Sequence, residues 1–302
     1  MLKSFDDMEK AILNSGQIKK IALAGAHDED ALGSVVNAQR QGIARAILIG
    51  RQAKIEALLS EMGEKAADYE IIPLEAEMEM TTLACRMVAE GRADLPMKGK
   101  VQTASYIRAV LDKSLGFIPE KGLISQATVF EYPVDGRLMI ITDCAINIAP
   151  DYAAKVKIVN NAVRLAKNLG CEKPKVAVLA PVEVINPEMQ STIDAAMLAK
   201  AADRGQIKDC LIDGPLAFDN AISAEAAKHK GIESPVAGRA DIMLLPDLGA
   251  GNILTKALTY LAGYKTAGTV AGTTRPVIMT SRTDSSQDKY HSILCSVYQT
   301  LR

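Results

Sequence analysis

Short aliphatic segments alternate with amphipathic ones along most of this chain, and that alternation decides the class of fold. Residues 19–26 (KKIALAGA) are typical of a buried strand, a helical segment follows, and residues 44–50 (ARAILIG) provide a second strand. Two strands joined through a helix pair in parallel, and the helices then cover the sheet. The pattern returns after residue 151, with a long helix that we expect to end at Gly170. Further strands are predicted at 175–181, 209–214 and 240–247, with helices at about 187–203, 219–230 and 249–262.

One segment breaks this pattern. Residues 124–147 contain two alternating strands around the turn residues PVDG, which predicts an antiparallel hairpin. The length of 302 residues is enough for two lobes with separate cores. We therefore predict a two-lobed α/β/α protein with mainly parallel sheets. The first lobe is expected to hold residues 1–147 and a returning strand and helix in 268–302, and the second lobe residues 148–267.

Composition excludes several classes of function. A net charge of −1 and the absence of Trp argue against nucleic-acid binding. No apolar run reaches the roughly 18–20 residues that a membrane span needs, and the N-terminus lacks the features of a secretory signal. Five scattered cysteines without a CxxC pair favour reduced thiols and a cytoplasmic location. The three histidines and the cysteines show no metal-ligand spacing, so no metal site is expected.

The segment TSRTDSSQDKYHS (280–292) is the strongest candidate for chemistry. Ser281 and Arg282 follow a strand, and ligands of open α/β sheets bind outside the carboxyl ends of strands. A helix N-terminus beside an arginine is a plausible phosphate cradle. Asp284 and Asp288 are candidate bases. The alternative is ordinary helix capping, because Ser285 and Asp288 have the spacing of a capping box.

Two further segments resemble anion sites. In MKGKVQTASYIRAVL, Lys98 precedes a helix that begins near Thr103 and carries Arg108. In LLPDLGAGNILTKAL, Gly251 and Asn252 lie in a glycine-rich turn between a strand and a helix. The alternatives are solvated lysines before an ordinary helix and a tight turn with Asn252 near the cap. The spaced glycines and threonines of GTVAGTTRPV (268–277) are expected in a loop and are assigned no role.

Taken together, PDLGAGNILTKAL, RPVIMTSRTDSSQDK and VEVINPEMQSTIDAAMLAKAADRGQIKDCLIDGPLAFDNAIS resemble the phosphate acetyl/butyryltransferase family, and most of all its butyryltransferase branch. The resemblance extends over nearly the whole chain. It implies the reaction of acyl-CoA and phosphate to acyl phosphate and CoA, with the CoA thioester as substrate and no metal or redox cofactor. It also implies a fold like that of isocitrate and isopropylmalate dehydrogenases, an active cleft between the lobes, and a homo-oligomer.

The resemblance also suggests roles for individual residues. The family's Ser-Arg pair and the Asp seven positions after the Ser correspond to Ser281, Arg282 and Asp288, and Asp284 is the alternative base. Its threonine and the arginine five residues later correspond to Thr103 and Arg108, and a serine in the segment before the hairpin corresponds to Ser125. These residues, with Lys98, Gly251 and Asn252, are the expected catalytic and phosphate- or CoA-binding set.

The expected mechanism is direct transfer in a ternary complex, because only Cys144 is remotely placed as a nucleophile and it lacks a His partner. The pKa of an ordinary Asp lies about 4–5 units below that of a thiol, so transfer of the thiol proton to such a base costs roughly 6 kcal/mol. A bound dianion beside a carboxylate raises the pKa of that carboxylate and so reduces the difference. The alternatives are a phosphate acetyltransferase, a metal- and NAD-dependent dehydrogenase on the same fold, and a non-catalytic protein that binds acyl-CoA or phosphate.

Overall fold

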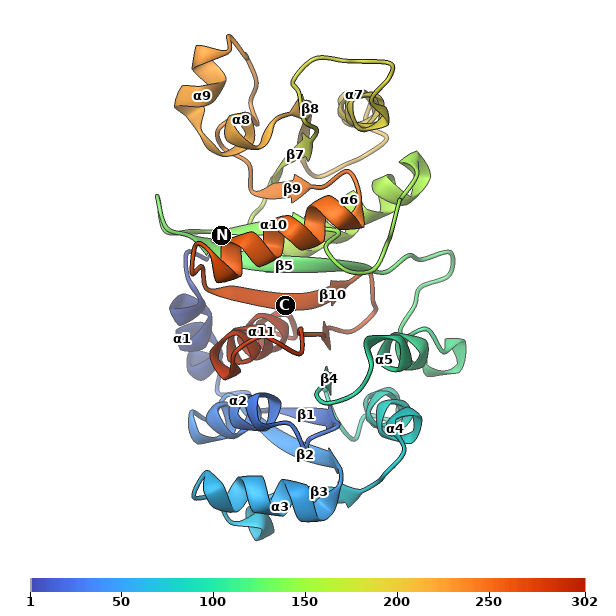
Figure 1. Ribbon diagram of the computed structural model, residues 1–302, viewed down its shortest axis with the longest axis vertical. Coiled ribbons are helices and arrows are strands. Elements are labelled where there is room, and N and C mark those ends of the chain that lie inside the picture. Colours follow the sequence, from blue (N-terminus) through green and yellow to red (C-terminus); the bar gives the residue numbers. More distant parts are fainter. Residues whose placement is uncertain (1, 302) are drawn as a thin grey trace. The chain divides into compact units, whose positions relative to one another are not determined.

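The structure is a computed structural model that describes residues 2–301, and its chain forms two compact units (Figure 1). The first, called here the N-terminal unit, contains Phe5–Gly122 and the chain from Thr266 onward. The second, called the central unit, contains Leu123–Lys265 and the described residues before Phe5. The hairpin thus belongs to the same unit as the chain that follows it. The lobe boundaries and the position of the active site relative to the lobes stay predictions.

The N-terminal unit is a mostly parallel sheet with strand order β3-β2-β1-β4-β11-β10, in which only β10 runs antiparallel to its neighbour β11. Helices α2, α3 and α11 lie on one face, where α1 packs on α11, and α4 and α5 lie on the other (Figure 1). The strands are β1 (Lys19–Ala24), β2 (Ala44–Gly50), β3 (Glu70–Pro73), β4 (Leu95–Lys98), β10 (Thr266–Ala271) and β11 (Val277–Ile278). The helices are α1 (Phe5–Ser15), α2 (Glu29–Arg40), α3 (Gln52–Glu61), η1 (Ala66–Asp68), α4 (Glu77–Ala89), α5 (Thr103–Val110), η2 (Lys113–Leu115) and α11 (Ser286–Gln299).

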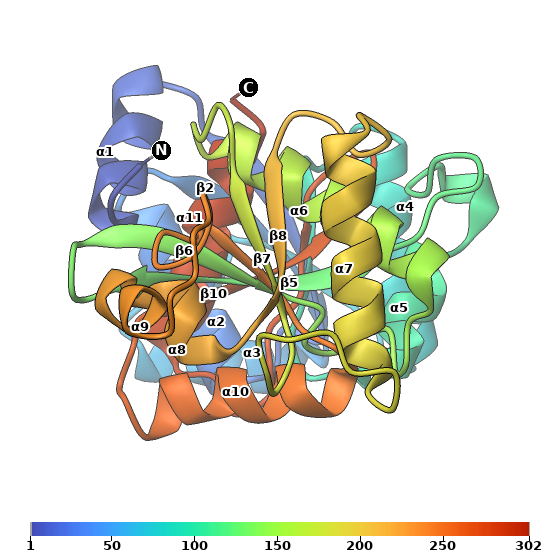
Figure 2. The same ribbon diagram turned by 90° about the horizontal axis from the view of Figure 1, so that it is seen from above.

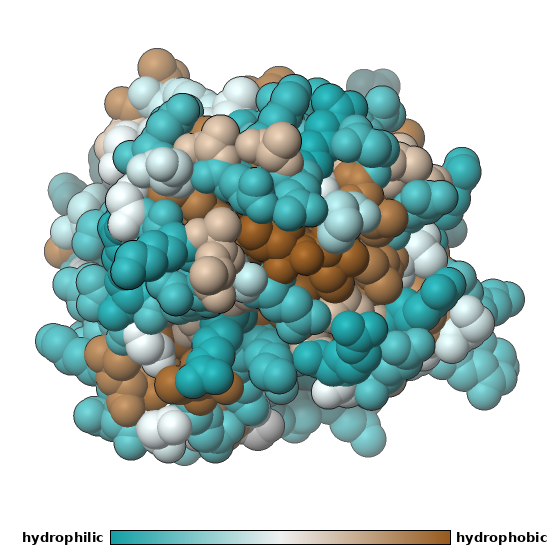
Figure 3. All heavy atoms as spheres, turned by 90° about the horizontal axis from the view of Figure 1, so that it is seen from below, coloured by the Kyte–Doolittle hydropathy of each residue, from teal (hydrophilic) through white to brown (hydrophobic). Residues whose placement is uncertain are grey.

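The free edge of this sheet is strand β3. Figure 3 shows the end of the N-terminal unit where α3 and β3 lie, and hydrophobic side chains gather there between hydrophilic ones. Ile71 and Ile72 of β3 are only half-buried, because β3 has a neighbour on one side alone.

The central unit has the strand order β5-β6-β9-β7-β8, with an antiparallel β5–β6 hairpin and parallel pairs from β6 onward. Helix α7 lies on one side of β7 and β8, and α8 and α9 lie on the other (Figure 2). The strands are β5 (Ser125–Tyr132), β6 (Arg137–Thr142), β7 (Lys175–Leu179), β8 (Leu211–Leu216) and β9 (Ile242–Leu244). The helices are α6 (Tyr152–Asn168), α7 (Gln190–Asp203), α8 (Phe218–Ile222), α9 (Ala224–His229) and α10 (Leu248–Tyr260).

The observed elements confirm the predicted α/β class and the hairpin. Three details differ from the expectation. The glycine-rich turn is the first turn of α10, because Asp247 caps a helix that begins at Leu248. The first part of the expected loop 268–277 belongs to strand β10, which ends at Ala271, and only the residues from 272 to 276 are irregular. The helix expected at 219–230 is divided, because the Ser223 side chain accepts a hydrogen bond from the Ala226 N–H and so starts α9 as a new helix.

Candidate functional site

Three parallel strands of the N-terminal unit end side by side. β4 pairs in parallel with β1 on one side and with β11 on the other, so their carboxyl ends meet at one edge of the sheet. Each strand leads through a short loop into a helix: β1 into α2, β4 into α5 and β11 into α11. Three helix N-termini with their partial positive charge therefore gather at this edge, an arrangement suited to an anion.

The loops after β1 and β4 are in backbone contact. The Lys100 N–H donates to the Gly25 carbonyl at 2.9 Å, and a Cβ at Gly99 would lie 2.5 Å from that same carbonyl oxygen. Gly99 is therefore required by the close approach of the neighbouring loop.

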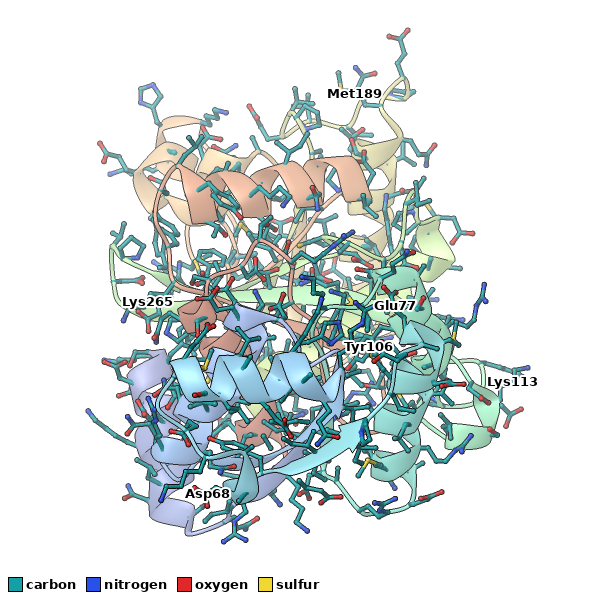
Figure 4. All side chains as sticks on the ribbon, turned by 60° about the horizontal axis from the view of Figure 1, so that its bottom comes forward. Asp68, Glu77, Tyr106, Lys113, Met189 and Lys265 are labelled. Atoms are coloured by element: carbon teal, nitrogen blue, oxygen red, sulfur yellow. The ribbon has the colours of Figure 1, made fainter. Side chains whose placement is uncertain are left out.

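The start of α5 is held from two directions. The Gln102 N–H donates to the carboxylate of Glu77 at 3.1 Å, and the Tyr106 hydroxyl donates to the Ile278 carbonyl at 3.2 Å. Figure 4 shows Glu77 and Tyr106 on α4 and α5. Thr103 is the first residue of α5 and Arg108 lies five residues later, and both are exposed.

Arg282 follows β11 and is exposed, like Ser281 before it. Within residues 2–301 neither Arg282 nor Arg108 forms an ion pair with a carboxylate. The Ser281 hydroxyl lies 3.1 Å from the Thr283 hydroxyl. Both guanidinium groups are thus available to an anion from solution.

The two candidate bases have different surroundings. Ser285 forms its half of the predicted capping box, because its hydroxyl accepts from the Asp288 N–H at 3.1 Å; the Asp288 Oδ2 in turn accepts from that hydroxyl at 2.7 Å. The Asp288 Oδ1 accepts from the Thr266 N–H at 3.2 Å, which ties α11 to β10. Asp284 Oδ2 accepts from the Ser281 N–H at 2.7 Å and so lies in the same turn as Arg282.

Two lysines of this edge are buried. Lys98, the last residue of β4, and Lys289 of α11 are each 2% exposed. Lys289 donates to the Asp284 carbonyl. Burial lowers the pKa of Lys98 to about 8, assisted by the nearby positive charges of Arg282 and Lys289. The structure therefore brings together Lys98, Arg282 and Asp284 from the predicted set.

The other predicted residues belong to the central unit. Ser125 is fully buried, and its hydroxyl accepts from the Asn161 side chain at 3.2 Å. Gly251 packs on Asp143, since a Cβ there would lie 2.2 Å from the Asp143 carbonyl oxygen. The Asn252 side chain donates to the Cys144 carbonyl at 3.3 Å. Each of these three residues thus has a contact within its own unit that accounts for its chemical type.

Cys144 is a poor nucleophile in this structure. It is 2% exposed, and burial raises the pKa of its thiol to about 12, so the reactive thiolate is scarce near neutral pH.

Sequence reasoning missed two groups at the strand ends. Thr280, just after β11, is 5% exposed, and its hydroxyl has no hydrogen-bond partner among residues 2–301. His27, just after β1, has a buried Nδ1 that is likewise without a hydrogen-bond partner in the described part of the chain. Burial lowers the pKa of His27, and the positive charges of Arg51 and Lys100 lower it further. The only signal available was their position just after an apolar run.

A search of the described residues finds no group of three or more His, Cys, Asp or Glu side chains that could hold a metal ion. In the same part of the chain, no helix combines the length and the apolar character needed to cross a membrane.

Comparison with known proteins gives concordant matches. A family model described as phosphate acetyl/butaryl transferase matches residues 55–297. The phosphate butyryltransferase of Clostridium acetobutylicum is 45% identical over 293 residues, covering 97% of either chain. The phosphate acetyltransferase of Thermotoga maritima is 41% identical over 290 residues, covering 96% of this chain and 98% of the relative.

Solved structures agree with these matches. A branched-chain phosphotransacylase from Enterococcus faecalis superposes with a TM-score of 0.81 at 30% identity, covering 94% of this chain and 99% of its own. A 4-hydroxythreonine-4-phosphate dehydrogenase from Klebsiella pneumoniae superposes with a TM-score of 0.57 at 12% identity, covering 94% and 99%. The second likeness shows the fold alone, and it confirms the expected dehydrogenase-like α/β fold.

Proposed function

This chain belongs to the phosphate acetyl/butyryl transferase family, and on that premise we propose that it transfers the acyl group of a short-chain acyl-CoA to phosphate, giving an acyl phosphate and CoA. Butyryl-CoA is the expected substrate, because 45% identity to a phosphate butyryltransferase exceeds the 41% to a phosphate acetyltransferase. A phosphate acetyltransferase is the second candidate, because the two identities differ by little.

The proposal rests mainly on the positively charged groups at the sheet edge where β4 and β11 end. Arg282 is exposed there without an ion pair among the described residues, Lys98 is buried beside it, and the N-terminus of α11 follows. A tetrahedral dianion matches this set, because Arg offers a bidentate fork and a helix N-terminus offers N–H groups. Arg108 and Thr103 at the start of α5 are proposed as further contacts to phosphate or CoA.

In the direction from acyl phosphate to CoA, a base removes the thiol proton and the sulfur attacks the acyl carbon. Arg282 and Arg108 then stabilise the charge that develops on the leaving phosphate. Ser281 donates to the carbonyl oxygen, and one such donor is typically worth about 3–4 kcal/mol. The roles of Ser125, Gly251 and Asn252 in binding CoA remain proposals.

Geometry favours Asp284 over Asp288 as the base. Both oxygens of Asp288 accept hydrogen bonds that hold the start of α11 and join it to β10. Asp284 lies in the turn that carries Ser281 and Arg282, where the proposed reaction takes place. The sequence had favoured Asp288, so the two residues need a direct test.

Transfer is proposed to be direct, without an acyl-enzyme, and without a metal or redox cofactor. The five cysteines are unpaired, and burial raises the pKa of Cys144 to about 12 and that of Cys295 to about 12. Free thiols are also consistent with a cytoplasmic location. Mass spectrometry of the intact protein after incubation with butyryl-CoA alone tests this mechanism, because a stoichiometric acyl adduct would require a covalent route.

The activity itself is tested by release of free CoA thiol from acetyl-, butyryl- and isobutyryl-CoA, with and without phosphate. We expect phosphate-dependent thiol release that is fastest with a four-carbon acyl group. Tight binding of CoA without thiol release would instead indicate a non-catalytic binding protein, and reduction of NAD with hydroxyacids would indicate a dehydrogenase.

We also propose that the protein forms a homo-oligomer. Helix α10 is largely exposed although it is apolar, with Ile253 at 71% and Tyr260 at 57% relative exposure, and the following Leu261 at 88%. Large apolar surfaces of this kind usually mark interaction sites.

A further inference from the structure

Lys98 is a buried cation with too few partners. Its side chain is 2% exposed, and within residues 2–301 its Nζ makes one hydrogen bond, a 3.4 Å contact with the carbonyl of the adjacent Gly99. An ammonium group has three donors. Because a buried charge without compensating hydrogen bonds is costly, a lysine in this position needs an explanation.

Charges of both signs surround Lys98. Arg282 and Lys289 disfavour its ammonium form, whereas Asp28 and Asp284 favour it. Lys98 itself forms no ion pair within 4.0 Å in the described part of the chain. Two cations therefore oppose the ammonium form of Lys98 and two carboxylates favour it, and among residues 2–301 neither carboxylate forms an ion pair with it.

The two nearby carboxylates already have contacts of their own. Asp28 caps α2, since its side chain accepts from the Ala31 N–H at 2.9 Å. Asp284 accepts from the Ser281 N–H at 2.7 Å. Both are thus anchored to the backbone.

A second buried polar group lies on the adjacent strand end. The Thr280 hydroxyl, just after β11, is 5% exposed and has no hydrogen-bond partner among residues 2–301. β11 pairs directly with β4, with Ile278 opposite Met97, so Thr280 and Lys98 belong to neighbouring strand ends. Buried polar groups are nearly always hydrogen-bonded, and two under-satisfied ones at one sheet edge point to a polar ligand.

We propose that a tetrahedral dianion bound where β4 and β11 end completes the surroundings of Lys98, and that Lys98 takes up a proton from solvent as the anion binds. The empty site releases this proton more readily than the occupied one, so anion binding and protonation of the amine are coupled. No covalent bond changes, and one proton moves between the amine and water. The inference rests on the proposed function in that the natural dianion is phosphate or the phosphoryl group of the acyl phosphate.

The titration of Lys98 is consistent with this coupling. Burial, with the charge of Arg282 next in effect, lowers the pKa of Lys98 to about 8, so the empty site already loses the proton in mildly alkaline solution. A dianion nearby favours the charged form and raises that pKa. Anion affinity must therefore fall as the pH rises above about 8, because Lys98 then has to take up a proton from solvent for the anion to bind.

Sulfate is the appropriate probe, because it remains a dianion across the whole range whereas phosphate titrates near neutrality. Binding is measured calorimetrically at about pH 8.5 in two buffers of different ionisation enthalpy, which gives the number of protons taken up. Wild type, Lys98→Met and the matched control Lys100→Met are compared. Lys100 is exposed in the same loop, so its variant removes the same charge from the same segment.

We expect wild type and Lys100→Met to take up roughly half a proton or more per sulfate at this pH. The dissociation constant should rise between about pH 7.5 and 9.5, with a slope approaching tenfold per pH unit. Lys98→Met should bind sulfate more weakly, with no proton uptake and no such slope. If this variant misfolds, Lys98→Arg, which stays charged, should bind sulfate without proton uptake.

The inference is overturned if wild type binds no sulfate, if binding takes up no proton, or if Lys98→Met takes up as much proton as wild type. Failure of the proposed function is distinguishable from these outcomes. Coupled sulfate binding without thiol release from any acyl-CoA would retain the anion site and remove the acyltransferase. Thiol release without a Lys98-dependent proton uptake would retain the acyltransferase activity and reject the proton-coupled anion site.

Discussion

Arg282 is the exposed cation on which the proposed phosphate site most depends. Arg282→Ala should lower kcat/KM by about 10²–10³-fold, or roughly 3–4 kcal/mol, because a bidentate contact to the phosphoryl oxygens is lost. The thermal unfolding midpoint should stay within a few degrees of wild type, since the side chain is exposed. Arg92→Ala is the control, because Arg92 makes only an exposed 3.6 Å pair with Glu70. Equal kcat/KM for the two variants would remove Arg282 from the site.

Asp284, just before α11, and Asp288, in its first turn, are expected to differ in their importance for catalysis and for stability. Asp284→Asn should reduce turnover by at least about tenfold, because an amide cannot accept the thiol proton. Asp288→Asn should lower the free energy of unfolding by about 1–2 kcal/mol, because the carboxylate contacts to the Ser285 hydroxyl and the Thr266 N–H lose their charge, with a smaller effect on turnover. Steady-state kinetics and urea unfolding of both variants check this. The reverse ranking in turnover would assign the base to Asp288.

Lys98 should make the folded protein less stable at neutral pH. Its pKa falls from 10.5 to about 8 on folding, so between these pH values the unfolded chain binds more protons, and stability rises with pH. The lowered pKa of Lys98 reduces the free energy of unfolding by about 3 kcal/mol at neutral pH, and about 1 kcal/mol of this loss disappears between pH 7 and 9. Lys98→Met should therefore be more stable than wild type at pH 7, by a margin that narrows at pH 9. Urea unfolding at both pH values measures it, and a less stable variant at pH 7 would contradict the expectation.

At the scale of elements, local patterns predicted those features that local physics decides. The strand–helix alternation predicted β1, α2 and β2, and the spacing of Ser285 and Asp288 predicted the cap of α11. The role of the glycine-rich stretch at 249–252 could not be read in the same way. A glycine needed for a turn and a glycine needed for close packing look alike in sequence, and only the fold shows that Gly251 lies against Asp143.

That contact gives a prediction for α10. Gly251→Ala should destabilise the central unit by several kcal/mol, because its Cβ would lie 2.2 Å from the Asp143 carbonyl oxygen and the backbone must move. Gly249→Ala is the matched control in the same helical turn, where the Cβ would meet only the Asp247 side chain at 3.1 Å. Differential scanning calorimetry should show a large decrease in the unfolding midpoint for the first variant and a small change for the second. Similar midpoints would show that α10 can shift to relieve the contact.

At the scale of the whole molecule, the class of fold and the family were predictable, whereas the burial of single polar groups was not. Lys98 was expected to contact an anion, but its 2% exposure depends on how β1, β11 and α4 pack around β4. Thr280 and His27 escaped notice for the same reason. Such buried polar groups respond most to a ligand or a proton, and their burial can be learned only from the structure.

Assembly is the last property that these surfaces predict. Ile253 and Leu261, which lie on α10 and just after it, are 71% and 88% exposed, and apolar side chains of this size would be buried if a second copy covered this helix. Leu261→Glu should shift the protein toward smaller species, because a carboxylate buried in an apolar contact is costly. Light scattering after size-exclusion chromatography measures the mass, and Leu13→Glu on α1, a 46% exposed apolar residue of the N-terminal unit, is the control. A wild-type mass equal to one chain of 32.3 kDa would show that the exposed helix serves another purpose. An oligomer that persists in Leu261→Glu would place the subunit contact on a different surface.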